Sequence, residues 1–229
     1  MSLFAIADLH LSLGTDKPMD IFSGWTDYVK RLENNWKSLV TDEDTVVIAG
    51  DISWAMKLEE CVADFAFINS LPGKKILLKG NHDYWWATKK KIDAFLELNS
   101  FDTISVLFNN AYEVGDFAVC GTRGWFLDAS EKEDVKVLNR EVGRLTSSIK
   151  EARRFNKEIV AFLHYPPVYG GVECEELLNV LLENGIKKCY YGHLHGANTI
   201  KYALNGEYKG IDFRLISCDG VRFTPILVR

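Results

Sequence analysis

The sequence predicts an α/β protein, and three observations support this. Short runs rich in β-branched and aromatic residues, such as Thr45–Ala49 and Ile159–Leu163, are typical of strands buried on both faces. Longer segments between these runs carry apolar residues at every third or fourth position, which indicates amphipathic helices. Asp, Asn, His or Gly closes the runs, as expected where a strand gives way to a loop.

The predicted elements alternate along most of the chain. We expect strands over residues 3–7, 45–49, 75–78, 104–108, 159–163 and 188–191, and a hairpin arm over 114–121 with its turn at Gly115-Asp116. We expect helices over residues 25–39, 61–71, 86–98, 131–154 and 173–183, each with its apolar stripe packed on the core. The highly charged segment 131–154 is interpreted as a helix with one solvated face; a lid or partner surface is the second interpretation.

The pattern changes after Gly196, where strands are predicted without helices between them. These strands cover residues 199–204, 213–217 and 223–228, and Asn205-Gly206 is the expected hairpin turn. The sequence contains no repeat, low-complexity tract or linker. We therefore expect one domain over residues 1–229.

Composition excludes several classes of protein. Hydrophobic residues make up 47% and charged residues 26% of the 229 residues, as in ordinary globular proteins. The net charge of −5 argues against general nucleic-acid binding and against an anionic membrane surface, although a bound metal could still attract a small phosphorylated substrate. No signal peptide or apolar run of membrane-spanning length is visible, so we expect a cytoplasmic location. The five cysteines lack zinc-site spacing.

All five histidines of the chain directly follow predicted strands. They belong to the segments Asp8-Leu9-His10, Gly80-Asn81-His82-Asp83, His164-Tyr165, and Gly192-His193-Leu194-His195, and the segment Gly50-Asp51 closes a fifth strand. In open α/β sheets, ligands bind beyond the carboxyl ends of the strands. One histidine at such a place would be unremarkable, but all five together indicate a site.

Asp, Asn and His side chains of this kind are ligands for metals such as manganese, iron or zinc. The candidates are too many for one ion; they are Asp8, His10, Asp51, Asn81, His164, His193 and His195. Two ions that share one carboxylate would use them all, and such pairs stabilise both sides of a displacement at phosphorus. A small excess of positive charge would then remain, which suits a phosphate oxyanion.

The ordered set Asp-x-His, Gly-Asp, Gly-Asn-His-Asp, His and Gly-His-x-His, from residue 8 to residue 195, resembles the calcineurin-like metallophosphoesterase superfamily, including its bacterial predicted phosphohydrolases. The resemblance implies a two-layer β-sandwich of mixed sheets flanked by helices, in which the strands after Gly196 complete the second sheet. It also implies two divalent or trivalent metal ions and a phosphomonoester or phosphodiester substrate. The nucleophile would be a water or hydroxide that bridges the metals, without a covalent phospho-enzyme.

The resemblance also assigns individual residues. Asp8, His10, Asp51 and His195 would hold one metal, and Asp51, Asn81, His164 and His193 would hold the other, with Asp51 as the bridge. His82 resembles the histidine that protonates the leaving group or steadies the phosphate.

Two further residues are candidates on chemical grounds. Asp83 is expected to orient the ring of His82, and the alternative is a turn or cap residue. Arg123 follows a predicted strand and lies between Gly121 and Gly124, and it is a candidate phosphate-binding residue. A surface arginine in a turn is equally consistent with this position.

The main alternative function is a non-catalytic metal-binding scaffold of the same fold. A scaffold would be expected to have lost some ligands or the proton donor. Because Asp51, Asn81, His82 and the later histidines are all present, the enzyme is favoured. A mononuclear zinc hydrolase would leave several of these ligands without a role. The substrate class stays open between monoesters, diesters and nucleotides, because fold does not determine substrate.

Overall fold

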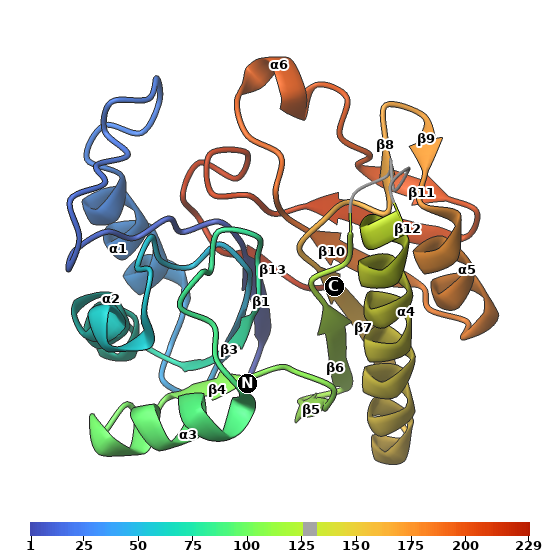
Figure 1. Ribbon diagram of the computed structural model, residues 1–229, viewed down its shortest axis with the longest axis horizontal. Coiled ribbons are helices and arrows are strands. Elements are labelled where there is room, and N and C mark those ends of the chain that lie inside the picture. Colours follow the sequence, from blue (N-terminus) through green and yellow to red (C-terminus); the bar gives the residue numbers. More distant parts are fainter. Residues whose placement is uncertain (126–131) are drawn as a thin grey trace.

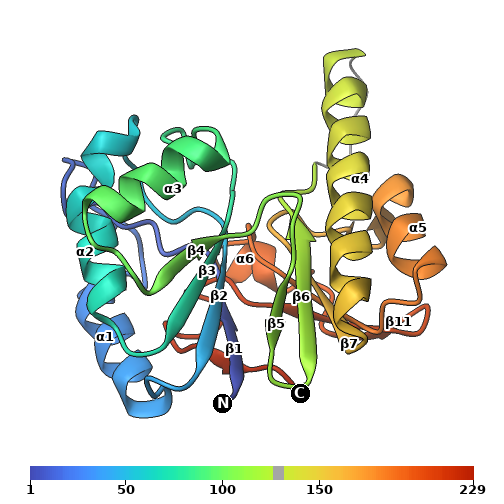
Figure 2. The same cartoon turned by 90° about the horizontal axis from the view of Figure 1, so that it is seen from below.

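The two central layers of the protein are β-sheets that pack face to face, with helices on both outer sides (Figures 1 and 2). The computed structural model describes residues 1–125 and 132–229. Helices α1 (Tyr28–Leu39), α2 (Val62–Ser70) and α3 (Lys89–Leu98) cover the first sheet, and α4 (Lys132–Ala152) and α5 (Glu175–Glu183) cover the second. The expected sandwich of mixed sheets flanked by helices is confirmed.

The first sheet has the strand order β13-β1-β2-β3-β4. Its four N-terminal strands are parallel and β13 is antiparallel to β1. Their bounds are β1 (Leu3–Ile6), β2 (Thr45–Ala49), β3 (Lys74–Leu78), β4 (Ile104–Val106) and β13 (Ile226–Leu227).

The second sheet has the order β11-β12-β10-β7-β6-β5, in which the inner four strands are parallel and the two edge strands antiparallel. Its strands are β5 (Tyr112–Val114), β6 (Phe117–Thr122), β7 (Glu158–Leu163), β10 (Lys188–Tyr191), β11 (Gly206–Tyr208) and β12 (Ile211–Leu215). The short elements are the hairpin β8 (Val168–Tyr169) and β9 (Val172–Glu173), the helix α6 (Ala197–Ile200), and the 3₁₀ turns η1 (Leu58–Cys61) and η2 (Arg153–Phe155).

Both faces of the central strands are buried, which explains their continuous apolar sequences. In β1, Leu3 and Ala5 contribute to the core between the two sheets, whereas Phe4 and Ile6 contribute to the core under α1–α3. Because side chains alternate between faces, one strand serves both cores. The hairpin turn at Gly115-Asp116 is confirmed, since Val114 pairs with Phe117.

The C-terminal region differs from the sequence-based expectation. The predicted strand 199–204 is wrong: residues 197–200 form the helix α6, and Ile200 and Leu204, four residues apart, both pack against the core of the second sheet. The hairpin turn between β11 and β12 is Lys209-Gly210, both with positive φ, and not Asn205-Gly206. The side-chain oxygen of Asn205 instead accepts a hydrogen bond from the amide of Leu215.

Two other expectations need correction or lie outside the described residues. The strands after Gly196 do not all complete the second sheet, because β13 pairs with β1 of the first. The predicted helix 131–154 corresponds to α4, but its first residue, Glu131, lies outside the described residues. Within residues 1–125 and 132–229, no helix is both long and apolar enough to cross a bilayer.

The two sheets are joined at the edge where the site residues lie. The amide of Ala7, just after β1, donates to the carbonyl of Ile216 after β12, and the amide of Cys218 donates back to the carbonyl of Ala7. The amide of Gly192, after β10, donates to the carbonyl of His164, after β7. These bonds extend the strand pairing beyond the strand ends and bring loops from both sheets together.

Candidate metal centre

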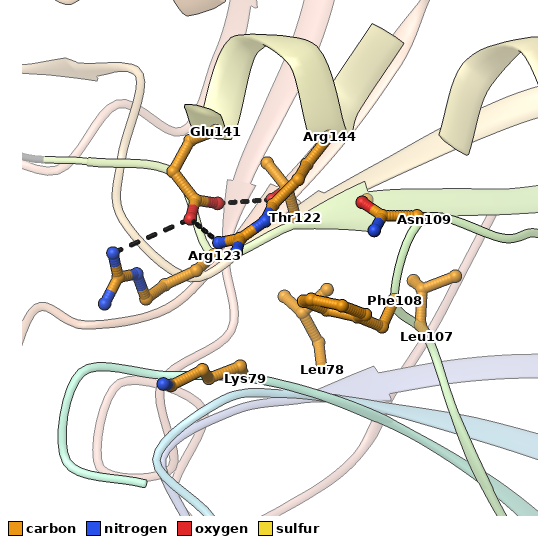
Figure 3. Close-up of a pocket in the computed structure, with 10 residues that line it drawn as sticks. Leu78, Lys79, Leu107, Phe108, Asn109, Thr122, Arg123, Glu141 and Arg144 are labelled. Carbon is orange, nitrogen blue, oxygen red and sulfur yellow. Dashed lines mark hydrogen bonds and ion pairs between the residues drawn. The ribbon is translucent and has the colours of Figure 1, made fainter. Parts of the chain in front are cut away.

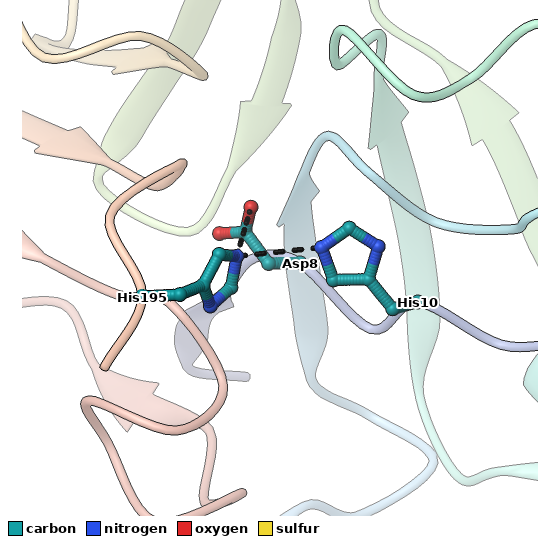
Figure 4. A group of neighbouring side chains, drawn as sticks. All are labelled: Asp8, His10 and His195. Carbon is teal, nitrogen blue, oxygen red and sulfur yellow. Dashed lines mark hydrogen bonds and ion pairs between the residues drawn. The ribbon is translucent and has the colours of Figure 1, made fainter. Parts of the chain in front are cut away.

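The first cluster of potential ligands consists of Asp8, His10 and His195 (Figure 4). The Nε2 atoms of His10 and His195 are 3.3 Å apart, and Nε2 of His195 lies 3.2 Å from Oδ1 of Asp8. Asp8 and His10 are buried, whereas the side chain of His195 is partly exposed. Two imidazole nitrogens and a carboxylate oxygen that converge at this distance form a suitable site for a cation.

The second cluster contains Asp51, His164 and His193, with Asn81 between the two rings. The Oδ1 atom of Asn81 lies 2.6 Å from Nε2 of His164 and 2.9 Å from Nδ1 of His193. The other ring nitrogen of His164, Nδ1, lies 3.1 Å from the carbonyl oxygen of Ala49. If Nδ1 carries the proton, Nε2 is left free as a ligand, which is a common arrangement around protein-bound metals.

Asp51 lies between the two clusters. Its Oδ2 atom is 3.7 Å from Nε2 of His10 and 3.5 Å from Nε2 of His164. Its Oδ1 atom accepts a hydrogen bond of 2.7 Å from the amide of His82. The carboxylate is thus held by the backbone and directed at both groups of ligands, as a bridging ligand requires.

The backbone at the site is unusual. Asp8, His10, Asp51 and His193 all have positive φ values, between 46° and 72°. Residues with a Cβ rarely adopt this conformation, and each instance costs on the order of 1–3 kcal/mol. These sharp turns at the strand ends direct side chains from three loops to one place, and the surrounding fold stabilises them.

Two glycines of the motifs are required by close packing. A Cβ on Gly80 would lie 2.1 Å from Oδ1 of Asp51, and a Cβ on Gly192 would lie 2.5 Å from Oδ2 of Asp8. Both distances are far below a van der Waals contact. Glycine precedes Asn81 and His193 because the backbone there packs directly against a carboxylate of the site.

Asp219 is a residue of the site that the sequence analysis did not identify. Nδ1 of His195 lies 2.9 Å from Oδ1 of Asp219, and Oδ2 of Asp219 accepts a hydrogen bond from the amide of Gly196. The sequence did contain a pattern that could have identified Asp219: it precedes a glycine and follows a predicted strand, just as Asp8 and Asp51 each follow a predicted strand. Its partner became recognisable only once the fold placed residues 195 and 219 side by side.

Asp83 does not occupy the position expected of it. Its buried carboxylate accepts hydrogen bonds from the indole of Trp85 and from four amides, those of Asp51, Ile52, Ser53 and Gly80. With both oxygens engaged, Asp83 supports the loop that carries Asp51 rather than orienting the ring of His82. The alternative of a turn residue agrees with the structure, because the amide of Trp86 donates to the carbonyl of Asp83 at 3.2 Å, whereas a helix cap is ruled out since residues 84–88 are not helical.

His82 lies at the rim of the site, outside both ligand clusters. Its ring is half-buried against Trp54, with 4.6 Å between the ring centroids, and 5.7 Å from the ring of His10. Trp54 also stacks on His10, at 4.9 Å between centroids. Burial, followed by the charge of His164, lowers the pKa of His82 and so favours the neutral ring.

The electrostatics of the site favour bound cations. Burial, followed by the charge of Asp8, raises the pKa of Asp51. Burial lowers the pKa of both His10 and His193 to about 3, so these rings are neutral and able to bind metal. For His195, burial is outweighed by Asp8 and Asp219, which raise its pKa to about 10. Protons held on Asp51 and His195, whose pKa values are raised, supply positive charge where metal ions would bind.

Arg123 lies beside the centre rather than in it. It follows β6, and its carbonyl accepts hydrogen bonds from the amides of His164 and Tyr165. Its guanidinium lies over the ring of Trp125 and has an Nη2 atom 3.6 Å from Oε1 of Glu141 (Figure 3). A bidentate grip on a phosphate at the metal centre therefore stays a prediction.

An apolar cavity of about 340 Å³ adjoins the centre. Its walls include the candidate ligands His193 and His195, together with Tyr165, Tyr169 and Leu194. The ring of Tyr165 lies 4.3 Å from that of His193, measured between centroids. A molecule held at the ligand clusters could extend an uncharged group into this space.

Residues 1–197 match the calcineurin-like phosphoesterase family. The fold resembles that of a phosphopantetheinyl hydrolase (PptH) from Mycobacterium tuberculosis, with 15% identity, a TM-score of 0.55 and coverage of 99% of this chain and 95% of that one. A second crystal structure has 15% identity, a TM-score of 0.57 and coverage of 93% and 88%. AQ665 from Aquifex aeolicus, a protein of unknown function, has 16% identity, a TM-score of 0.49 and coverage of 99% and 95%. At these identities the likeness concerns the fold alone. No curated protein matches the chain significantly.

Proposed function

The chain belongs to the calcineurin-like phosphoesterase family, and we propose that it hydrolyses a phosphomonoester or phosphodiester bond of a small molecule with two metal ions. The observation that carries the proposal is the position of Asp51, whose Oδ2 lies within 3.7 Å of His10 and 3.5 Å of His164. One carboxylate oxygen between two sets of ligands is what a two-metal site requires.

The donor atoms fit two ions. Asp8, His10, Asp51 and His195 would hold one ion, and Asp51, Asn81, His164 and His193 would hold the other. Mixed imidazole and carboxylate ligands suit manganese, iron or zinc. When bound, the ions would supply the charge that stabilises the phosphate and lower the pKa of the attacking water.

The protein's own groups would position the substrate and handle one proton. His82 lies next to both clusters and belongs to neither, and its Nδ1 atom lies 3.5 Å from the hydroxyl of Tyr84, so the ring would present its other nitrogen to the substrate. A phosphate next to the ring would raise its pKa, after which His82 would protonate the leaving oxygen or steady the phosphate. Asp83 and Asp219 would act as positioning residues, through Asp51 and His195 respectively.

The apolar cavity next to His193 and His195 supports an ester with an uncharged organic group. The name of the structurally similar phosphopantetheinyl hydrolase is consistent with a small phosphorylated substrate, which could be a nucleotide or a phosphodiester. Tyr165 and Leu194 would contact the organic group of such a substrate, while the phosphate lies at the ligand clusters.

The test is a substrate panel assayed with Mn²⁺. It compares p-nitrophenyl phosphate, bis-p-nitrophenyl phosphate and cyclic nucleotides, using wild-type protein, Asp51→Ala and the exposed control Asp16→Ala. We expect turnover of at least one ester by the wild type and the control, with Asp51→Ala losing both activity and most bound metal.

Two results would contradict the proposal. Full metal occupancy with near-normal turnover in Asp51→Ala would refute the two-metal assignment. Two bound ions without turnover of any ester would favour the non-catalytic scaffold.

A further inference from the structure

A groove of about 500 Å³ with a positively charged lining includes residues on both sides of the segment that carries Asn81 and His82. Lysines, one arginine and two aromatic rings form most of its described lining, and no carboxylate is among them: Lys79, Trp86, Lys89, Lys91, Phe108 and Arg144. The whole chain carries a net charge of −5, so this concentration of positive charge is not a consequence of composition. Such a local potential attracts anions.

Two of these cations form no ion pair within the described part of the chain. Lys89 pairs with Asp93 at 2.7 Å, and Arg144 pairs with Glu141. Lys79 and Lys91, in contrast, make no side-chain hydrogen bond or ion pair with any described residue. Lys79 is also half-buried, and a partly desolvated ammonium group without a partner is costly unless an anion binds to it.

The groove continues into a smaller pocket in which the positive groups are held in place (Figure 3). Glu141 is fully buried and contacts Arg123, Arg144 and the hydroxyl of Thr122. Lys79 lies across the pocket from these residues, and its ammonium group is not engaged by Glu141. The pocket therefore contains three positive groups and one negative group, which leaves a net positive charge.

The groove is also close to the reacting centre. Lys79 is two residues from the candidate ligand Asn81, so the two Cα atoms are at most about 7 Å apart. Trp86 is four residues beyond His82, on the same loop. A substrate phosphate at the metal centre would therefore be within reach of the groove through a short organic linker.

We propose that this groove, with Lys79 and Lys91 as its principal cations, binds a second phosphate of the substrate, distinct from the phosphate that is hydrolysed. The inference rests on the proposed phosphoesterase function and narrows the substrate to esters that carry two phosphates. The scissile phosphate lies at the metal ligands, and the second one pairs with the ammonium groups that have no partner.

Non-hydrolysable probes test the groove without relying on turnover. Calorimetry measures the binding of α,ω-alkane diphosphonates, with linkers of two to eight carbons, to the metal-loaded protein; alkyl monophosphonates of the same length are the reference. We expect diphosphonates within one range of linker lengths to bind at least about tenfold more tightly than the monophosphonates, because a charged hydrogen bond contributes a gain in affinity of about that size. Lys79→Gln and Lys91→Gln should each reduce the ratio of diphosphonate affinity to monophosphonate affinity to about threefold or less.

Lys90→Gln is the matched control, because Lys90 lies between Lys89 and Lys91 on α3 but does not line the groove. It should retain the full ratio. Equal affinity for mono- and diphosphonates at every length, or an unchanged ratio in Lys79→Gln and Lys91→Gln, would overturn the proposal. Tight diphosphonate binding in a protein that hydrolyses no ester would refute the phosphoesterase function but leave the anion site established.

Discussion

His195 and Asp219 form a hydrogen-bonded pair, with 2.9 Å between Nδ1 and Oδ1, which fixes the ring so that Nε2 is directed at Asp8. Asp219→Ala should therefore weaken metal binding by about 10- to 100-fold, the usual effect of removing the partner of a metal-binding histidine. Metal affinity is measured by competition with a chromophoric chelator. Asp212→Ala, which removes an exposed carboxylate paired with Arg214, is the control. Unchanged affinity in Asp219→Ala would mean that packing alone orients His195.

Asp83→Asn should destabilise the protein as well as the site. The carboxylate accepts hydrogen bonds from four amides and one indole, and the amide of asparagine can replace only some of these acceptors. Buried donors without an acceptor cost about 1–3 kcal/mol each, so we expect the free energy of unfolding to fall by about 3 kcal/mol or more. Urea denaturation measures this change. Normal stability, with a loss confined to turnover, would restore the role of Asp83 in orienting His82.

The residues that the sequence predicted well are those whose chemistry and position agree. Asp8 and Asp51 follow neighbouring parallel strands, which end at one edge of the same sheet, so their proximity could be expected. His193 follows β10 of the other sheet and reaches them only through the packing of the two sheets. The partners of Asp83 at residues 51–53 could not be predicted, since these amides approach it only through the pairing of β2 with β3. The segment 199–204 was misassigned because a short apolar pattern fits a strand and a helical turn equally well.

Metal binding should release protons at pH 7. In the metal-free site His195 is protonated, because Asp8 and Asp219 outweigh burial and raise its pKa to about 10, and Asp51 also has a raised pKa. A raised pKa stabilises the folded metal-free protein at low pH, and this stability is lost as pH rises from about 6.5 through about 10 for His195. Metal must displace such protons, so apparent affinity should increase with pH up to that range.

Titration calorimetry in buffers of different ionisation enthalpy measures this release. We expect between one and two protons per protein, and fewer in Asp219→Ala, because loss of that carboxylate lowers the pKa of His195. A binding enthalpy that is the same in every buffer would show that the metal-free site holds no such proton.

The last prediction concerns His82, the histidine outside both ligand clusters. If its ring protonates the leaving oxygen, the loss in His82→Ala should depend on how basic that oxygen is. An alkoxide needs the proton and p-nitrophenolate hardly does, so turnover of an alkyl phosphate should fall by about 10²–10⁴-fold and that of p-nitrophenyl phosphate much less. Both metals should stay bound, which metal analysis checks. An equal loss on the two substrates would indicate that His82 stabilises the phosphate instead, and a loss of metal would identify it as a ligand.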